Sequence, residues 1–326
     1  DLAINGSFWI EGAIGTAGAL VLLDPGLFGP DTGWRIAFLL GALPGPVNLL
    51  IRRWIPESPR WLATHGREAE AEKIADAIES GFLQRGIALA DTASLAPLIL
   101  RPRRATPLSQ VFQTLFVTYR TRTCVALSLM AAQAFFYNSI FFTYALVLTN
   151  FYGVPAAEAG WHVLPFTLSN VLGALALAPF FYSAARKPMI TLTYGASGVL
   201  LAAGGFLFAR GLLGLTELTA VWTIVFFFAS PAAGAAYLTA SESFPVEIRA
   251  MAIAFFFSAG TAIGGMAAPF LFGKLIESGS RMSLFGGYLL GAGLMIAAAI
   301  IMQVWGVAAE RKPLESVAPP LSSVKK

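Results

Sequence analysis

Among the polar side chains inside the long apolar stretches of this sequence are two amides and one carboxyl group that could do chemistry, because a polar group without a partner is costly there. Gln133 and Asn138 lie in the apolar run Cys124–Leu148. Each amide could hydrogen-bond a bound solute, or it could link two helices. Glu11 lies about 10 Å from one end of the first run, at 1.5 Å per residue. Glycines follow it one and two turns later, so we expect Glu11 on a small-residue face that packs inward. Its carboxyl group could couple proton movement to solute binding, or it could be a structural acid that is protonated or paired.

The elements that carry these side chains are eight apolar runs of about 20 residues, the length that crosses a bilayer as a helix. Hydrophobic residues make up 56% of the chain and charged residues 12%, against about 25% charged in soluble domains. The runs are too long for barrel strands and do not alternate. We therefore expect an all-α integral membrane protein. The runs are Ile4–Leu23, Trp34–Ile51, Cys124–Leu148, Trp161–Phe181, Met189–Ala209, Leu218–Ala240, Ala250–Gly273 and Leu284–Gly306.

The basic residues are distributed unevenly between the two sides of these runs. Eighteen of the 22 Lys and Arg residues fall on the side that carries both termini and the long loop after the second run. Cytoplasmic loops carry such an excess, so both termini are expected in the cytoplasm. Runs rich in glycine and alanine, with short outer loops, favour a plasma membrane of the bacterial inner type. Because topology explains the positive charge, the lipid bilayer is the expected partner, and no nucleic acid is indicated.

Two short motifs lie at the expected cytoplasmic side. Pro56–Leu62 (Pro-Glu-Ser-Pro-Arg-Trp-Leu) follows the second run, and its prolines stop that helix. Glu57 and Arg60 are thereby left at the membrane surface. Glu242–Arg249 follows the sixth run with the pattern Glu-x-x-Pro-x-x-x-Arg. Both motifs resemble those of the major facilitator superfamily of transporters, in particular its sugar-porter and metabolite-symporter branches, and the resemblance covers nearly the whole chain.

The resemblance implies a major facilitator type helical bundle, in which the eight runs are the last eight of twelve spans. Residues 1–55 would then be the last two helices of an N-terminal half, and residues 56–119 a cytoplasmic central loop. Residues 120–308 would be the six-helix C-terminal half, and 309–326 a cytoplasmic tail. Within the loop, apolar residues at helical spacing predict an amphipathic helix over Arg67–Leu83, either solvated or lying on the membrane. The first four spans would be missing, and we expect such a fragment not to transport.

The resemblance also assigns roles to charged residues. Glu242 and Arg249 would belong to salt bridges that hold a transporter closed towards the cytoplasm and break when it opens inward. Arg186, in a loop where the family often has an arginine pair, would join this gate, as would Glu57 and Arg60. The full-length protein is expected to be a secondary active transporter that works by alternating access, with protons as the coupling ion.

The third similarity concerns the substrate. In sugar porters, the pattern Gln-x-x-Gly-x-Asn followed by two aromatic residues binds the sugar, and Gln133, Asn138 and Phe142 match it. However, Phe136 stands in place of the glycine that breaks that helix. In a regular helix Gln133 and Asn138 lie about 140° apart, so we do not expect both to face one site. Tyr237 stands where sugar porters carry a tryptophan. The expected substrate is therefore a small metabolite, with organic or aromatic acids weighed equally with sugars.

Other classes of protein are less well supported by the residues. The chain has two histidines and no spacing that suggests a metal cluster or a Ser/His/Asp set, so no enzyme, cofactor or metal is expected. No repeated filter-like loop indicates a channel. A membrane sensor or binding subunit that does not transport, or an inactive truncated fragment, stays open as an alternative.

Overall fold

The computed structural model describes residues 2–24, 26–29, 31–89, 99–101, 105–156, 158–183, 186–310 and 312–323. For residues 2–5, 182 and 183 it describes the backbone alone. Among the described residues nearly all regular structure is helical, with one isolated antiparallel bridge between Leu100 and Ser323. This confirms the all-α prediction.

Seven helical segments are long and apolar enough to cross a membrane, and a shorter apolar helix, Gly6–Leu22, lies within the first run. The eight expected runs therefore all form helices. Their bounds are α1 Leu2–Leu22, α2 Gly33–Ala42 with α3 Pro44–Ile51, α7 Arg120–Ile140 with α8 Tyr144–Tyr152, α9 Ala159–Ser183, α10 Arg186–Ala209, α11 Leu215–Ser243, α12 Val246–Gly260 with η2 Thr261–Met266 and α13 Ala267–Glu277, and α14 Arg281–Trp305.

The third run is broken where the sequence suggested a continuous helix. α7 ends at Ile140 and α8 begins at Tyr144. Just before the break, the hydroxyl of Ser139 donates to the carbonyl of Phe136 at 2.9 Å, and that of Thr143 donates to Ser139 at 2.5 Å. Hydroxyls that bond to carbonyls of the preceding turn compete with the helix ladder and bend helices. The break therefore comes after Phe136, and α7 is regular at that position.

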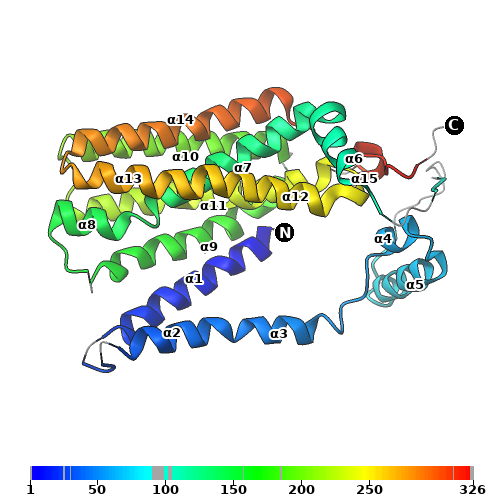
Figure 1. Cartoon of the computed structure of the whole chain (residues 1–326), viewed down its shortest axis with the longest axis horizontal. Helices are drawn as coiled ribbons and strands as arrows, with labels where there is room; N and C mark the ends of the chain where they lie inside the picture. The colour runs from blue at the N-terminus through cyan, green and yellow to red at the C-terminus, as the bar shows by residue number, and fades with distance from the viewer. Residues whose placement is uncertain are drawn as a thin grey trace.

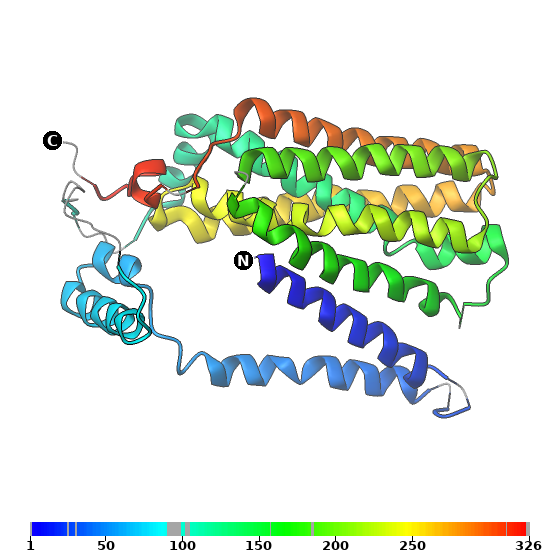
Figure 2. The ribbon, with the colours of Figure 1, turned by 180° about the vertical axis from the view of Figure 1, so that it is seen from behind.

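The helices α7 to α14 form one bundle, in which α10 packs along α14, α9 along α11, and α7 against α14 and η2 (Figure 1). α1 lies along α9 at the edge of this bundle. α2 and α3 run beyond α1 and bury almost nothing, since Gly33 is the single buried residue of the two helices. Figure 2 shows the same arrangement from behind.

One end of the bundle carries the helices of the charged segment, and we call it the linker end. Here lie α4 Pro59–Thr64, α5 Glu68–Gln84, α6 Leu108–Gln113 and α15 Leu314–Val317. α4 starts at Pro59, a residue suited to the first helical position because its missing N–H is not needed there. α5 coincides with the predicted amphipathic helix. The helix of the third run, α7, begins at Arg120 and not at Cys124 as expected. It is preceded by α6 and by the π-helical turn η1 Thr114–Thr118.

Candidate functional site

A cavity of about 750 Å³ opens between α1, α7, α11, α12 and η2. The four residues predicted to contact a substrate all line it: Gln133, Asn138, Phe142 and Tyr237. They come from α7, from the break that follows it, and from α11. Charged side chains are absent from the part of its lining that the structure describes. The cavity can therefore hold a small organic molecule through ring contacts and neutral hydrogen-bonding groups.

The prediction that Gln133 and Asn138 could not face one site is wrong. α7 is regular between them, so they do lie about 140° apart around its axis. However, the cavity is bounded by a broad face of α7 that also includes Met130, Ala134 and Tyr137. These positions follow the spacing i, i+3, i+4, i+7 and i+8, which marks one wide helical face. Gln133 and Asn138 occupy the two edges of that face.

The amide groups of the cavity are only partly satisfied within the protein. One N–H of Asn138 donates to the carbonyl of Ala134 at 2.8 Å. The Gln133 amide nitrogen makes a weak contact of 3.8 Å with the sulfur of Met130, and Tyr237 lines the same cavity. Gln133 is 9% exposed. The Gln133 amide of α7 and the Tyr237 phenol of α11 are therefore polar groups of the lining that a solute can contact.

Four aromatic residues of the cavity were not identified from the sequence as binding residues, and contacts within the protein hold two of them, Tyr137 and Trp9. Tyr137 donates its hydroxyl to the Asn170 side-chain oxygen at 2.7 Å, and Asn170 in turn donates to the carbonyl of Phe166. Trp9 of α1 stacks on the Tyr137 ring, with centroids 5.1 Å apart and planes 25° apart. The available signal was the position of Tyr137 one turn after Gln133. Nothing in the sequence pairs Trp9 with α7.

Glu11 does not lie on a packed face, so this part of the prediction is wrong. Its side chain is exposed, and nothing lies within 4 Å of a Cβ placed on Gly15 or Gly18. The face of α1 that packs carries Gly6 and Gly12, which approach α9. Glycine spacing alone does not say which of two small-residue faces meets a neighbouring helix.

At the linker end, Arg186 at the start of α10 forms an ion pair with Glu242 near the end of α11. Their side chains are 12% and 19% exposed. Glu310, which follows α14, accepts from the backbone N–H of Arg186 and of Lys187. Partial burial alone would raise the pKa of Glu310, but hydrogen bonds from backbone amides and the charge of Arg186 outweigh it and lower the pKa. Two carboxylates therefore hold the start of α10.

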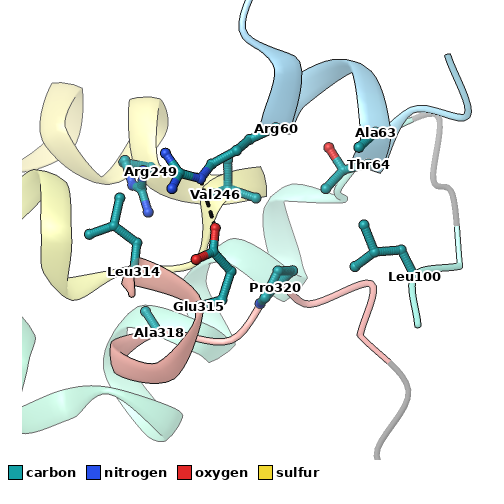
Figure 3. Close-up of a pocket in the computed structure, with 10 residues that line it drawn as sticks. All are labelled: Arg60, Ala63, Thr64, Leu100, Val246, Arg249, Leu314, Glu315, Ala318 and Pro320. Carbon is teal, nitrogen blue, oxygen red and sulfur yellow. Dashed lines mark hydrogen bonds and ion pairs between the residues drawn. The ribbon is translucent and has the colours of Figure 1, made fainter. Parts of the chain in front are cut away.

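Other charges predicted for the gate have different partners. Arg249 donates to the carbonyl of Phe244, at 3.3 Å from Nη2 and 3.4 Å from Nε. Arg60 in α4 pairs with Glu315 in α15, with 2.7 Å between Nε and Oε1. Both arginines lie beside Glu315 (Figure 3), and all three residues line a cavity of about 100 Å³. Glu57 is exposed.

Partial burial would by itself raise the pKa of Glu315. Hydrogen bonds from its own backbone N–H and from Arg60, together with the charges of Arg60 and Arg249, outweigh burial and hold that pKa below its usual range.

Residues 313–323 fold back onto the linker end, and we call this segment the tail clasp. Glu247 of α12 accepts from the N–H of Leu321 at 3.0 Å, and from the N–H and hydroxyl of Ser322 at 2.9 and 2.6 Å. Arg122 of α7 donates to the carbonyls of Ser243 and Val317, each at 2.9 Å. The clasp thus joins α4, α7 and α12. The sequence offered no sign of it beyond a short charged tail.

Comparison with known proteins agrees with this architecture. The family model "Sugar (and other) transporter" matches residues 3–319. The chain is 25% identical to the niacin transporter NiaP of Acinetobacter baylyi, over 88% of this chain and 62% of that protein. It is 26% identical to the putative metabolite transport protein YdjK of Escherichia coli, over 90% of this chain and 62% of that protein. A shorter match, 36% identical over 73 residues, covers 22% of this chain and 14% of the arabinose-proton symporter of Bacillus subtilis.

The chain therefore spans less than two thirds of the length of the first two relatives. These relatives are named as transporters and not as enzymes, in keeping with the prediction from the motifs. Since the family model covers nearly all of the residues, the chain belongs to the sugar (and other) transporter family of the major facilitator superfamily.

Proposed function

We propose that the protein carries a small organic metabolite across a membrane by alternating access, with the α1/α7/α11/α12 cavity as the solute site. The observation that carries this proposal is that Gln133, Asn138, Phe142 and Tyr237 all line one cavity of about 750 Å³. That volume falls in the range of small-molecule sites, about 300–1,000 Å³. Aromatic walls with a few neutral polar groups are typical of such sites.

The gate in this proposal is at the linker end. Opening the bundle there must separate α10 from α11, which breaks the ion pair between Arg186 and Glu242. The pair between Arg60 and Glu315 joins the linker to the tail and would break in the same movement. Arg249 contributes through its bonds to the end of α11, and Glu57 supplies charge at the same surface. We place this end in the cytoplasm of a bacterial inner membrane, with both termini on that side.

Protons are the proposed coupling ion. Support comes from the arabinose-proton symporter among the similar proteins and from Glu11, an acid within an apolar helix. The proposed organisation is two helices of an N-terminal half in 1–55, a central loop in 56–119, a six-helix half in 120–308 and a tail in 309–326.

The test is uptake by the full gene product in proteoliposomes, with and without an imposed pH gradient. We expect Gln133→Leu and Asn138→Leu each to lower kcat/KM at least about tenfold, since each removes a hydrogen-bonding group from a buried site. Gln303→Leu is the matched control, because this amide lies exposed on α14, where it bonds to Thr191. Uptake that both cavity variants leave unchanged would refute the site. Solute binding without uptake by the wild-type protein would instead favour a sensor or binding subunit.

A further inference from the structure

The lining of the cavity is dominated by rings. Six aromatic residues contribute to it, from α1, α7, α11, α12 and the break after α7: Phe8, Trp9, Tyr137, Phe142, Tyr237 and Phe257. Aromatic rings attract one another in offset or edge-on pairs with centroids about 4.5–7 Å apart. Several of these rings already form such pairs, including Trp9 with Phe8 at 5.2 Å and Tyr237 with Phe257 at 6.1 Å. A ring entering the cavity would meet ring surfaces on more than one side.

These rings are held in place before any solute arrives. The Tyr137 hydroxyl is engaged by Asn170, so its ring orientation is set from α9. Trp9 is 7% exposed and packs on Tyr137 and on Phe141, with centroids at 5.1 and 5.3 Å. A binding surface that is already ordered loses less conformational freedom when the solute binds. The wall formed by α1 and α7 is therefore a preformed surface for stacking.

Part of the hydrogen-bonding capacity of the lining is already used within the protein. Gln133 of α7 and Tyr237 of α11 both line the cavity. Ser241 already donates to the carbonyl of Leu238, and one N–H of Asn138 to that of Ala134. A polyol carries a hydroxyl on nearly every carbon, and each one buried without a partner costs free energy. The polar groups of the lining can hydrogen-bond one polar substituent of a ring, but not the hydroxyls on every side of a sugar.

We infer that the cavity binds a planar aromatic solute, with the ring against Trp9 and Tyr137 and its polar substituent at Gln133 and Tyr237. This inference rests on the proposed function in that it uses the same cavity. It goes further by choosing one substrate class from those that the sequence left open. It concerns binding and does not depend on whether the protein transports.

The test is equilibrium dialysis of the full gene product in lipid nanodiscs against three radiolabelled probes. Benzamide and cyclohexanecarboxamide carry the same amide on a planar and on a puckered ring, and glucose is the polyol. We expect benzamide to bind at least about tenfold more tightly than either of the others, which is the scale of one or two ring contacts in offset or edge-on geometry. Equal binding of the two amides, or tighter binding of glucose, would overturn the inference.

Variants separate the ring contact from the polar contact. Trp9→Leu should reduce the preference for benzamide over cyclohexanecarboxamide to about threefold or less, whereas Trp9→Phe, which keeps a ring and guards against loss of folding, should retain most of it. Gln133→Leu should weaken both amides equally and leave their ratio unchanged. Trp161→Leu is the matched control, since Trp161 is 63% exposed on α9. A ratio that Trp9→Leu leaves unchanged would contradict the stacking arrangement.

Failure of this inference and failure of the proposed function give different results. Uptake of glucose without binding of benzamide would refute the aromatic substrate class but support the proposed transport. Selective binding of benzamide without uptake of any probe would support the aromatic site and count against the proposed transport.

Discussion

Gly264 lies where η2 crosses α7, and replacing it with alanine tests whether this crossing fixes the cavity wall. A Cβ at Gly264 would lie 2.2 Å from the backbone nitrogen of Phe135 and 2.7 Å from the carbonyl carbon of Ala134. Ordinary van der Waals contact begins at 3.4 Å, so the two segments would have to separate by about 1.2 Å. Because the obstructing atoms belong to a helix backbone, no side-chain rotation can relieve the contact.

The expected cost follows from this displacement. Overpacking of a well-packed interior costs about 1–3 kcal/mol, and backbone obstruction places Gly264→Ala at the upper end of that range. The higher helix propensity of alanine offsets about 1 kcal/mol. We therefore expect a net loss of about 2 kcal/mol in the free energy of unfolding, or a factor of about 30 in the folded-to-unfolded ratio.

The assay is unfolding in mixed detergent micelles by titration with a denaturing detergent, followed by circular dichroism. Gly273→Ala is the matched control on the same membrane-spanning segment, because nothing lies within 4 Å of its added Cβ. We expect that control to be neutral or up to about 1 kcal/mol more stable. Gly264→Ala should also weaken benzamide binding, since α7 carries Gln133. If Gly264→Ala unfolded at the same fraction of denaturing detergent as wild type, the close crossing of η2 and α7 would be refuted.

Three further predictions concern the linker end. Glu242→Gln should lower the free energy of unfolding by about 1–3 kcal/mol, because it leaves the mostly buried Arg186 guanidinium without its anion; an unchanged unfolding midpoint would contradict the pairing. Glu247→Ala removes the acceptor that holds the tail clasp, so limited proteolysis should cut within residues 313–323 several times faster, whereas the exposed Glu277→Ala should not change the rate. The pKa of Glu315 is lower in the folded protein than in the unfolded chain. The pair with Arg60 therefore contributes fully to the free energy of unfolding above about pH 4.3, and this contribution is lost as pH falls through the lowered folded pKa. Cleavage of the tail by pepsin, relative to cleavage of an unstructured reference peptide at each pH, should therefore rise as pH falls from 5 to 3, and Glu315→Gln should reduce that dependence.

The number of membrane-crossing runs and their helical type could be predicted because a bilayer allows few alternatives. Eight apolar runs of bilayer-crossing length must satisfy their backbone hydrogen bonds internally, and helices do so within one segment. The amphipathic helix α5 followed from local spacing in the same way. The break after Ile140 could not be predicted as readily, because it depends on the direction in which the hydroxyls of Ser139 and Thr143 point.

The candidate cavity was predictable in part. The motif similarity selected Gln133, Asn138, Phe142 and Tyr237, and all four line one cavity. The prediction that Gln133 and Asn138 could not share a site was wrong because it assumed that only a narrow stripe of α7 would line the site. A broad face of α7 lines the cavity. For Glu11, glycine spacing identified a small-residue face but not the one that meets α9.

By itself, the sequence determined that this is a helical membrane protein, where its helices lie, and that it resembles transporters, since apolar length and local motifs are properties of short segments. Only the tertiary structure decided that Trp9 stacks on Tyr137, that Glu247 holds the tail, and that Arg186 pairs with Glu242 while Arg249 bonds to a carbonyl. Such contacts join residues from different helices, and their partners are set by how the helices cross, which no local pattern encodes.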